Sequence, residues 1–196
     1  MIMKKIAIVL SALFVLTAFT THVDKYTVDV TKSKLVWKAE KVTGGHDGHV
    51  SLKSGNVFMD HGKIAKASFV VDMNTITNDD IKSEKYSNKL IGHLKSEDFF
   101  DVKKHPEVSF DMIKATPVGN GKFDVFGNIT IKGIKGVISF PMTLKESKSE
   151  LVVSGTFSFD RTKFDIKYDS GSFFENLGDR AINDEVVIDF NIVLYK

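Results

Sequence analysis

Two histidines, His46 and His49, are the residues in this chain best suited to hold a metal ion. They lie three positions apart with Asp47 between them, inside the glycine-rich segment 44–49. Imidazole and carboxylate groups are common zinc ligands, but a zinc site needs at least three of them. The segment offers no clear third ligand, and the sequence has neither an HExxH motif nor a cysteine. We therefore expect a polar hairpin turn here and no metal site.

Nucleophilic catalysis has little support in the sequence. No serine lies in a Gly-x-Ser-x-Gly motif, and Ser172, in the segment 170–174, is the nearest approach. The adjacent carboxylates Asp79 and Asp80 are better explained as charges that oppose the dipole of a helix beginning near them. Neither a GxGxxG motif nor a phosphate-binding loop occurs. We expect no catalytic residues and no nucleotide cofactor.

The elements that would position any site are predominantly strands. The clearest is the segment 186–194, in which apolar residues recur at every second position. Period two over nine residues is typical of a β-strand with one face in a core. The inward face would hold Val186, Ile188, Phe190, Ile192 and Leu194. Segments 69–73, 108–112, 123–131, 138–144 and 151–159 show the same alternation.

Glycine, asparagine and aspartate separate these strands. The segments 60–62 and 119–121 have the composition of tight hairpin turns, and 132–136 is a short connection with two glycines. Segment 160–183 has weak periodicity and is predicted to be a long loop or a loosely paired strand. Short strands joined by tight turns indicate an antiparallel sandwich or barrel, and closure would remove exposed sheet edges.

Residues 79–95 break the strand pattern and are predicted to be helical, in one piece or two. Thr77 and Asp80 fit a loose capping pattern, and Tyr86, Leu90 and Leu94 follow at helical spacing. Such a helix could close one end of a barrel as a lid, or pack outside as an ordinary connection. The sequence leaves both alternatives open.

The first twenty residues have the form of a secretory signal peptide. Lys4 and Lys5 precede an apolar run over 6–19 that is too short to span a bilayer comfortably. Cleavage near Thr20 would leave 21–196 as one domain with no stable membrane span; an uncleaved anchor is the alternative. We expect a periplasmic protein, or alternatively a secreted one.

Charge argues against nucleic acid as a partner. The whole chain carries 27 basic and 25 acidic residues, and residues 1–20 contain two lysines and no acid, which leaves 25 of each sign. No basic stripe remains to follow a phosphate backbone. The chain has no cysteine, so an exported form must be stabilised by its core alone.

Sixteen phenylalanines stand against one tryptophan and four tyrosines. Phenylalanine has no polar group and favours dry surroundings, so a filled core explains most of them. An eight-stranded barrel can also enclose space for one small ligand. We predict that the following residues line an apolar tunnel and bind lipid: Val71, Met73, Phe110, Met112, Phe157, Phe159, Ile188 and Phe190.

Several segments of the chain resemble those of the YceI-like family, in the family order. They are 33–38, 41–44, 68–76, 92–102 with 104–106, 127–134, 159–168 and 184–190. The resemblance implies an all-β fold, an extended antiparallel lipocalin-like barrel of about eight strands with a short helical insertion. It also implies that the barrel holds an isoprenoid chain such as a quinone, which would be the only bound group.

The resemblance directs attention to polar residues near the mouth of such a barrel. By position these are Lys41, His46, Arg161 and Tyr168. Arg161 could donate to a quinone or phosphate oxygen; the alternative is a structural salt bridge with Asp165 or Asp184. Many family members have a histidine directly after the first strand, whereas His46 here lies late in the expected loop 42–48.

The sequence therefore predicts an exported protein that sequesters or transports an isoprenoid lipid or quinone and is not an enzyme. Two alternatives stay open. One is an enzyme acting on a small hydrophobic substrate, with Arg161, His46 or Tyr168 in polar roles. The other is a stress-related barrel with a filled core. A homodimer is compatible with the chain, but no residue pattern argues for one.

Overall fold

The computed structural model describes residues 23–196, and the predicted signal peptide over 1–20 lies outside them. The described part of the chain contains nine strands, one α-helix and three short 3₁₀ helices. The strands are β1 (Val23–Val28), β2 (Lys34–Lys41), β3 (Gly44–Asp60), β4 (Lys63–Asp72), β5 (Glu107–Gly119), β6 (Lys122–Ile131), β7 (Ile134–Glu146), β8 (Glu150–Asp160) and β9 (Ile182–Tyr195). The helices are α1 (Glu84–Lys95), η1 (Met73–Thr75), η2 (Arg161–Phe164) and η3 (Gly178–Arg180).

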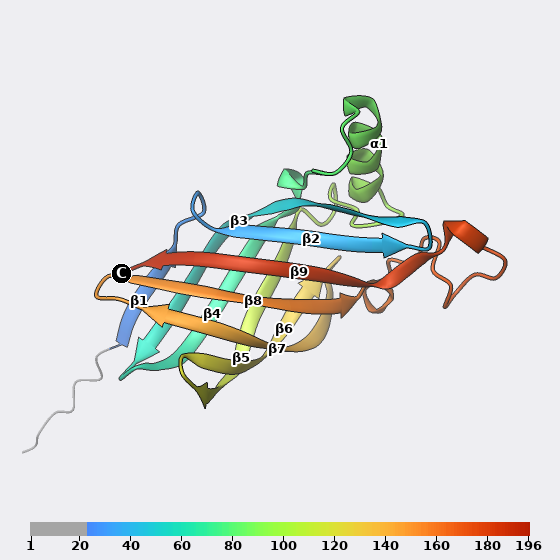
Figure 1. The fold of residues 1–196 in the computed structure, drawn as a ribbon. Helices are drawn as coiled ribbons and strands as arrows, with labels where there is room; N and C mark the ends of the chain where they lie inside the picture. Colours follow the sequence, from blue (N-terminus) through green and yellow to red (C-terminus); the bar gives the residue numbers. More distant parts are fainter. Residues whose placement is uncertain (1–22) are drawn as a thin grey trace, which may run out of the picture.

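Eight of these strands form a closed antiparallel barrel (Figure 1). The sheet order is β1-β3-β2-β9-β8-β7-β6-β5-β4, and β4 also pairs with β3, which closes the ring. β1 is the extra strand; it pairs with the far end of β3 and with the last residues of β9. The prediction of a lipocalin-like, all-β barrel with one short helix is confirmed.

The alternation in β9 places its apolar residues inside the barrel as predicted. Val186, Phe190, Ile192 and Leu194 are all buried, and Leu194 has no exposed surface. The residues of β8 opposite them follow the same pattern, with Leu151 paired to Leu194 and also fully buried. Burial of these side chains is the main stabilising contribution to such a fold.

The turn between β5 and β6 shows why the hairpin predictions succeed. Asn120 and Gly121 have φ values of 53° and 71°, which is the backbone that a two-residue type I′ turn requires. The turns at 61–62 and 132–133 have the same form. The last of these is shorter than expected, because Ile134 already belongs to β7.

The start of the helix was predicted incorrectly. Helix α1 begins at Glu84 with Ser83 as its N-cap, rather than at residue 79. The residues before it pair with β3 instead: the Thr77 N–H donates to the His49 carbonyl, and the Asp79 N–H to that of Asp47. These tertiary hydrogen bonds outcompete the local capping pattern, and Asp79 and Asp80 do not lie in the first turn.

The segment 44–49 is also not the expected loop. Only residues 42–43 form the turn, and Gly44 opens β3, which pairs with β2 as far as Val50 opposite Leu35. A side chain at Gly48 would overlap the Thr77 carbonyl. The glycine is therefore needed for a close approach of the segment before α1 and not for a turn.

The predicted long loop between β8 and β9 is present and is irregular, with η2 and η3 as short turns within it. An isolated bridge joins Ser170 to Ile182 near its end. Among residues 23–196, no helix has the length and apolar character needed to cross a membrane.

Candidate functional site

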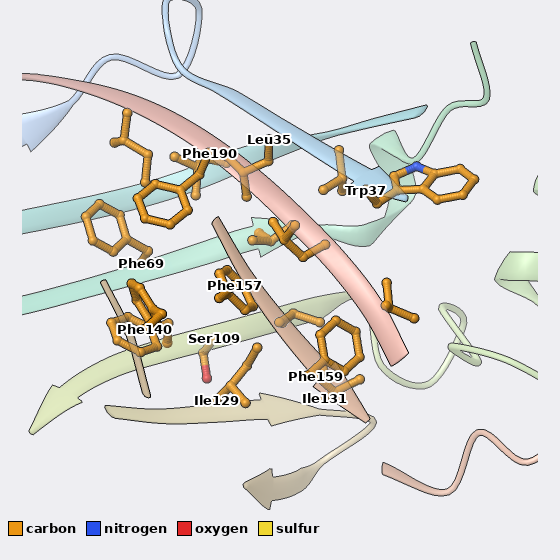
Figure 2. A pocket seen from close by; sticks show the side chains of 18 of the residues that line it. Leu35, Trp37, Phe69, Ser109, Ile129, Ile131, Phe140, Phe157, Phe159 and Phe190 are labelled. Atoms are coloured by element: carbon orange, nitrogen blue, oxygen red, sulfur yellow. The ribbon is translucent and has the colours of Figure 1, made fainter. Parts of the chain in front are cut away.

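The barrel encloses a cavity of about 180 Å³. Residues from all eight barrel strands line it, together with the end of α1 and the residues that follow. Figure 2 shows part of this lining. Of the 35 lining residues, only Arg161 is charged and only Ser109 carries a hydroxyl. Apolar cavities of roughly this size stay dry and accept apolar molecules. The interior can therefore bind a hydrocarbon but offers almost nothing to a polar ligand.

The eight residues predicted to bind lipid all lie on the wall of this cavity. They come from β4, β5, β8 and β9 and from η1. Their contact with a lipid stays a prediction.

A cluster of phenylalanines occupies the middle of the cavity wall. The ring of Phe140 lies 5.7 Å from that of Phe110, 5.2 Å from Phe157 and 5.7 Å from Phe190, measured between centroids. Figure 2 shows Phe140, Phe157 and Phe190 reaching inward from three different strands. Tilted and edge-on ring pairs at such separations are favourable. The cluster gives the cavity a wall that is aromatic and apolar.

Buried side chains lie toward both ends of the barrel. At one end Leu151 and Leu194 pair across β8 and β9, and Tyr26 packs there with its hydroxyl donating to Glu146 at 3.3 Å. At the other end Leu94 of α1 and Phe99 lie on the cavity wall and are both buried. Leu94 is the one buried residue of α1, so the helix reaches the cavity through its last turn only.

Some lining residues were missed by sequence reasoning. Phe140 follows the same alternation as its neighbours in β7 and could have been included. Trp37 lines the cavity, and its indole N–H donates to the Thr77 carbonyl at 3.0 Å. Phe99 and Phe100 come from the segment after α1, where no periodic pattern predicts that their side chains point into the barrel.

The four predicted head-group residues are placed differently from one another. Lys41 lines a shallow groove between the β2–β3 turn and the loop before β9. His46 Nδ1 lies 2.8 Å from Asp80 Oδ2. The ring of Tyr168 packs edge-on against His93 at 4.6 Å. Only Arg161 reaches the cavity wall, so the four residues do not form one polar site.

Arg161 is buried and holds the loop before β9 in place. Its five N–H donors all have partners: the carbonyls of 166, 168, 182 and 183, and the carboxylate of Asp184 at 3.2 Å. Burial lowers the pKa of Arg161, and Asp184 opposes that shift. The salt bridge with Asp184 is thus present, and a head-group role would require one of these bonds to open.

Asp80 ties the segment before α1 to β3. Burial acts to raise the pKa of Asp80, but hydrogen bonds from His46, Asn78 and the backbone N–H of Asp47 hold it below its ordinary value of 3.8. Asp79 forms a second ion pair nearby, with His49. These contacts fasten the segment before α1 to β3 from outside the cavity.

We expect Asp80→Asn to lower the free energy of unfolding at neutral pH by about 1 kcal/mol or less, because the pair is partly exposed. A carboxylate with a lowered pKa stabilises the fold above its unfolded-state pKa, and this contribution disappears as pH falls through the folded value. The difference between wild type and variant should therefore shrink below pH 3.8, the ordinary value. Urea unfolding at several pH values measures it. Asp124→Asn, at an exposed position in β6, is the control, and a difference that persisted unchanged into acid would contradict the assignment.

No cluster of three or more metal-binding side chains occurs within residues 23–196. His46 and His49 instead form ion pairs with separate aspartates, as described above.

Comparison with known proteins gives a consistent picture. The family model for the YceI-like domain matches residues 26–194. A UPF0312 protein of Vibrio parahaemolyticus is 33% identical over 89 residues, which are 44% of this chain and 43% of that protein. One from Pseudomonas putida is 30% identical over 89 residues, 45% of this chain and 44% of its own length. The matched segment thus spans less than half of these relatives.

Two solved structures share the fold. Burkholderia cenocepacia BcnA has a TM-score of 0.66 and 24% identity, covering 85% of this chain and 98% of that one. A polyisoprenoid-binding domain from Saccharophagus degradans has a TM-score of 0.65 and 17% identity, covering 87% and 97%. At these identities the likeness establishes the barrel architecture alone.

Proposed function

This chain belongs to the YceI-like family, and from that premise and the apolar cavity we propose that it binds an isoprenoid chain inside its barrel. The observation that carries the proposal is the cavity itself, which is lined by apolar side chains from every strand of the barrel. A hydrocarbon tail gains about 0.8 kcal/mol for each methylene that it buries. Such a ligand needs no polar partner, and the similarity to a polyisoprenoid-binding domain supports the same ligand class.

We further propose that the protein acts by sequestering or transporting its ligand, without chemistry. The polar side chains on which an enzyme would depend have structural partners: His46 binds Asp80, and the donors of Arg161 are all used by the chain. Tyr168 packs on His93 and Phe99. The pattern of residues 1–20 supports export, and the periplasm is the proposed compartment.

Trp37 offers a direct test, because it is the sole tryptophan of the chain and lines the cavity. Decylubiquinone added to delipidated protein should quench Trp37 fluorescence saturably, since a quinone ring quenches indole emission on close contact. Phytol, an isoprenoid alcohol without a quinone, should reverse the quenching by competition. Emission that stays unchanged with the quinone in excess, or quenching that phytol does not reverse, would contradict the proposal.

A further inference from the structure

Three glycines in the barrel wall each face a phenylalanine ring of the cavity. Gly55 of β3 pairs with Phe69 of β4, and Gly155 of β8 pairs with Phe190 of β9. Gly127 of β6 lies beside Phe110 of β5, diagonally across the strand pair. All three rings line the cavity.

A side chain at any of these glycines would collide with the ring that faces it. A Cβ atom at position 127 would lie 2.5 Å from Cε2 and from Cζ of Phe110, and one at position 155 would lie 2.8 Å from Cζ of Phe190. At position 55 the Cβ would overlap Cδ1 of Phe69 and lie 2.8 Å from Cε1. Contacts closer than 3.0 Å essentially never occur for real Cβ atoms, so each ring would have to move.

The backbone does not require glycine at these three positions. None of them has a positive φ, and glycine in the interior of a strand weakens it. What glycine supplies is space, because a ring on the neighbouring strand can lie back against bare backbone. The interior of an eight-stranded barrel is only just wide enough for its own side chains to fill. Rings that lie back against the wall leave room along the axis.

We propose that Gly55, Gly127 and Gly155 set the width of the cavity. This width admits methyl-branched chains as well as straight ones. The inference rests on the proposed function, and it deepens it by identifying residues that determine ligand class. An added methyl group pushes a ring toward the barrel axis and narrows the cavity. A methyl-branched chain is wider than a straight one, so its affinity falls first.

Gly55→Ala is the sharpest test, because the three atoms nearest to its new methyl group all belong to the side chain of Phe69. At Gly127 and Gly155 the methyl also meets a backbone carbonyl, of Asp111 and Pro141 respectively, each at 2.8 Å. Delipidated Gly55→Ala should bind geranylgeraniol about tenfold or more weakly than wild type, the effect expected for one methyl group too many in an apolar pocket. Binding of hexadecanol should change much less.

Two further variants separate cavity width from general destabilisation. Gly92→Ala places the same change on α1, where nothing lies within 4 Å, and should leave the affinity for both alcohols unchanged. Phe69→Leu in the Gly55→Ala background removes the displaced ring and should restore geranylgeraniol binding. Because residues in contact also couple in their effects on stability, urea unfolding of each variant is measured beside its affinity, and the binding effect should remain in variants that are folded at the assay temperature.

The outcomes distinguish this inference from the proposed function. If wild type binds neither alcohol, the proposed function fails. If wild type binds geranylgeraniol and Gly55→Ala binds both alcohols as wild type does, the glycines do not set the width. Equal weakening for both alcohols, without rescue by Phe69→Leu, would overturn the inference in the same way.

Discussion

Replacing Phe157 by aspartate is expected to weaken binding of an isoprenoid by about a hundredfold or more, because a carboxyl group without a partner in an apolar interior costs several kcal/mol. Phe157 lines the cavity and lies 5.2 Å from the ring of Phe140 and 6.2 Å from that of Phe190. Whether ionised or protonated, the new side chain would leave polar atoms without partners where the ligand lies. Titration of the delipidated variant with decylubiquinone, followed through Trp37, measures the loss.

The matched control is Phe126→Asp, which makes the same change on the outside of the barrel. Phe126 is 43% exposed and its neighbours in β6, Val125 and Gly127, are buried, so its side chain points to solvent. This variant should bind the quinone as wild type does. Circular dichroism shows whether each variant is folded, and Ala67→Leu, which adds volume on the cavity wall without a charge, gives a second route to the same loss. A folded Phe157→Asp variant with wild-type affinity would contradict a binding site in the barrel.

Arg161→Met is expected to cost about 3–5 kcal/mol in the free energy of unfolding, as is typical when one partner of a buried charge network is removed. The substitution leaves four carbonyls and the carboxylate of Asp184 without their donor. Each buried acceptor that is left without a partner contributes to this loss in the free energy of unfolding. Unfolding in guanidinium chloride, followed by circular dichroism, measures the change in midpoint.

Lys163→Met is the matched control in the same 3₁₀ helix. The Lys163 side chain is 75% exposed and its ammonium lies 3.8 Å from Asp160. An exposed pair of this kind contributes little, so the variant should stay within about 0.5 kcal/mol of wild type. If Arg161→Met unfolded at the same denaturant concentration as Lys163→Met, Arg161 would not be the anchor of this loop.

The strands and the cavity wall could be predicted because both follow from one local signal. Alternation along the segment 186–194 identifies β9 and also tells which side chains point inward. For that reason the predicted inward residues of β9 line the cavity, except Leu194, which is buried outside its lining. Phe140 shows the same signal and was accessible to the same reasoning.

What the sequence does not reveal depends on contacts between distant segments. Thr77 and Asp80 look locally like a helix cap, but their partners in the fold lie in β3. The acid that pairs with Arg161 could be narrowed to two aspartates, of which Asp184 is correct. Its four carbonyl partners are invisible in a sequence, because every residue carries a carbonyl.

The role of the cavity-wall glycines could likewise be predicted only in part from the sequence. Gly127 lies in a segment where apolar and polar residues alternate. This pattern predicts a strand that carries no side chain at position 127. The ring of Phe110 that fills this position becomes evident only when β5 and β6 are side by side.

The central claim is that the barrel holds an isoprenoid, and mass spectrometry of an organic extract tests it most directly. The full chain would be purified from its native host without detergent, alongside the Phe157→Asp variant. We predict one isoprenoid per wild-type protein and a depleted extract from the variant. An extract of folded wild type that contains no more isoprenoid than that of the variant would contradict the claim.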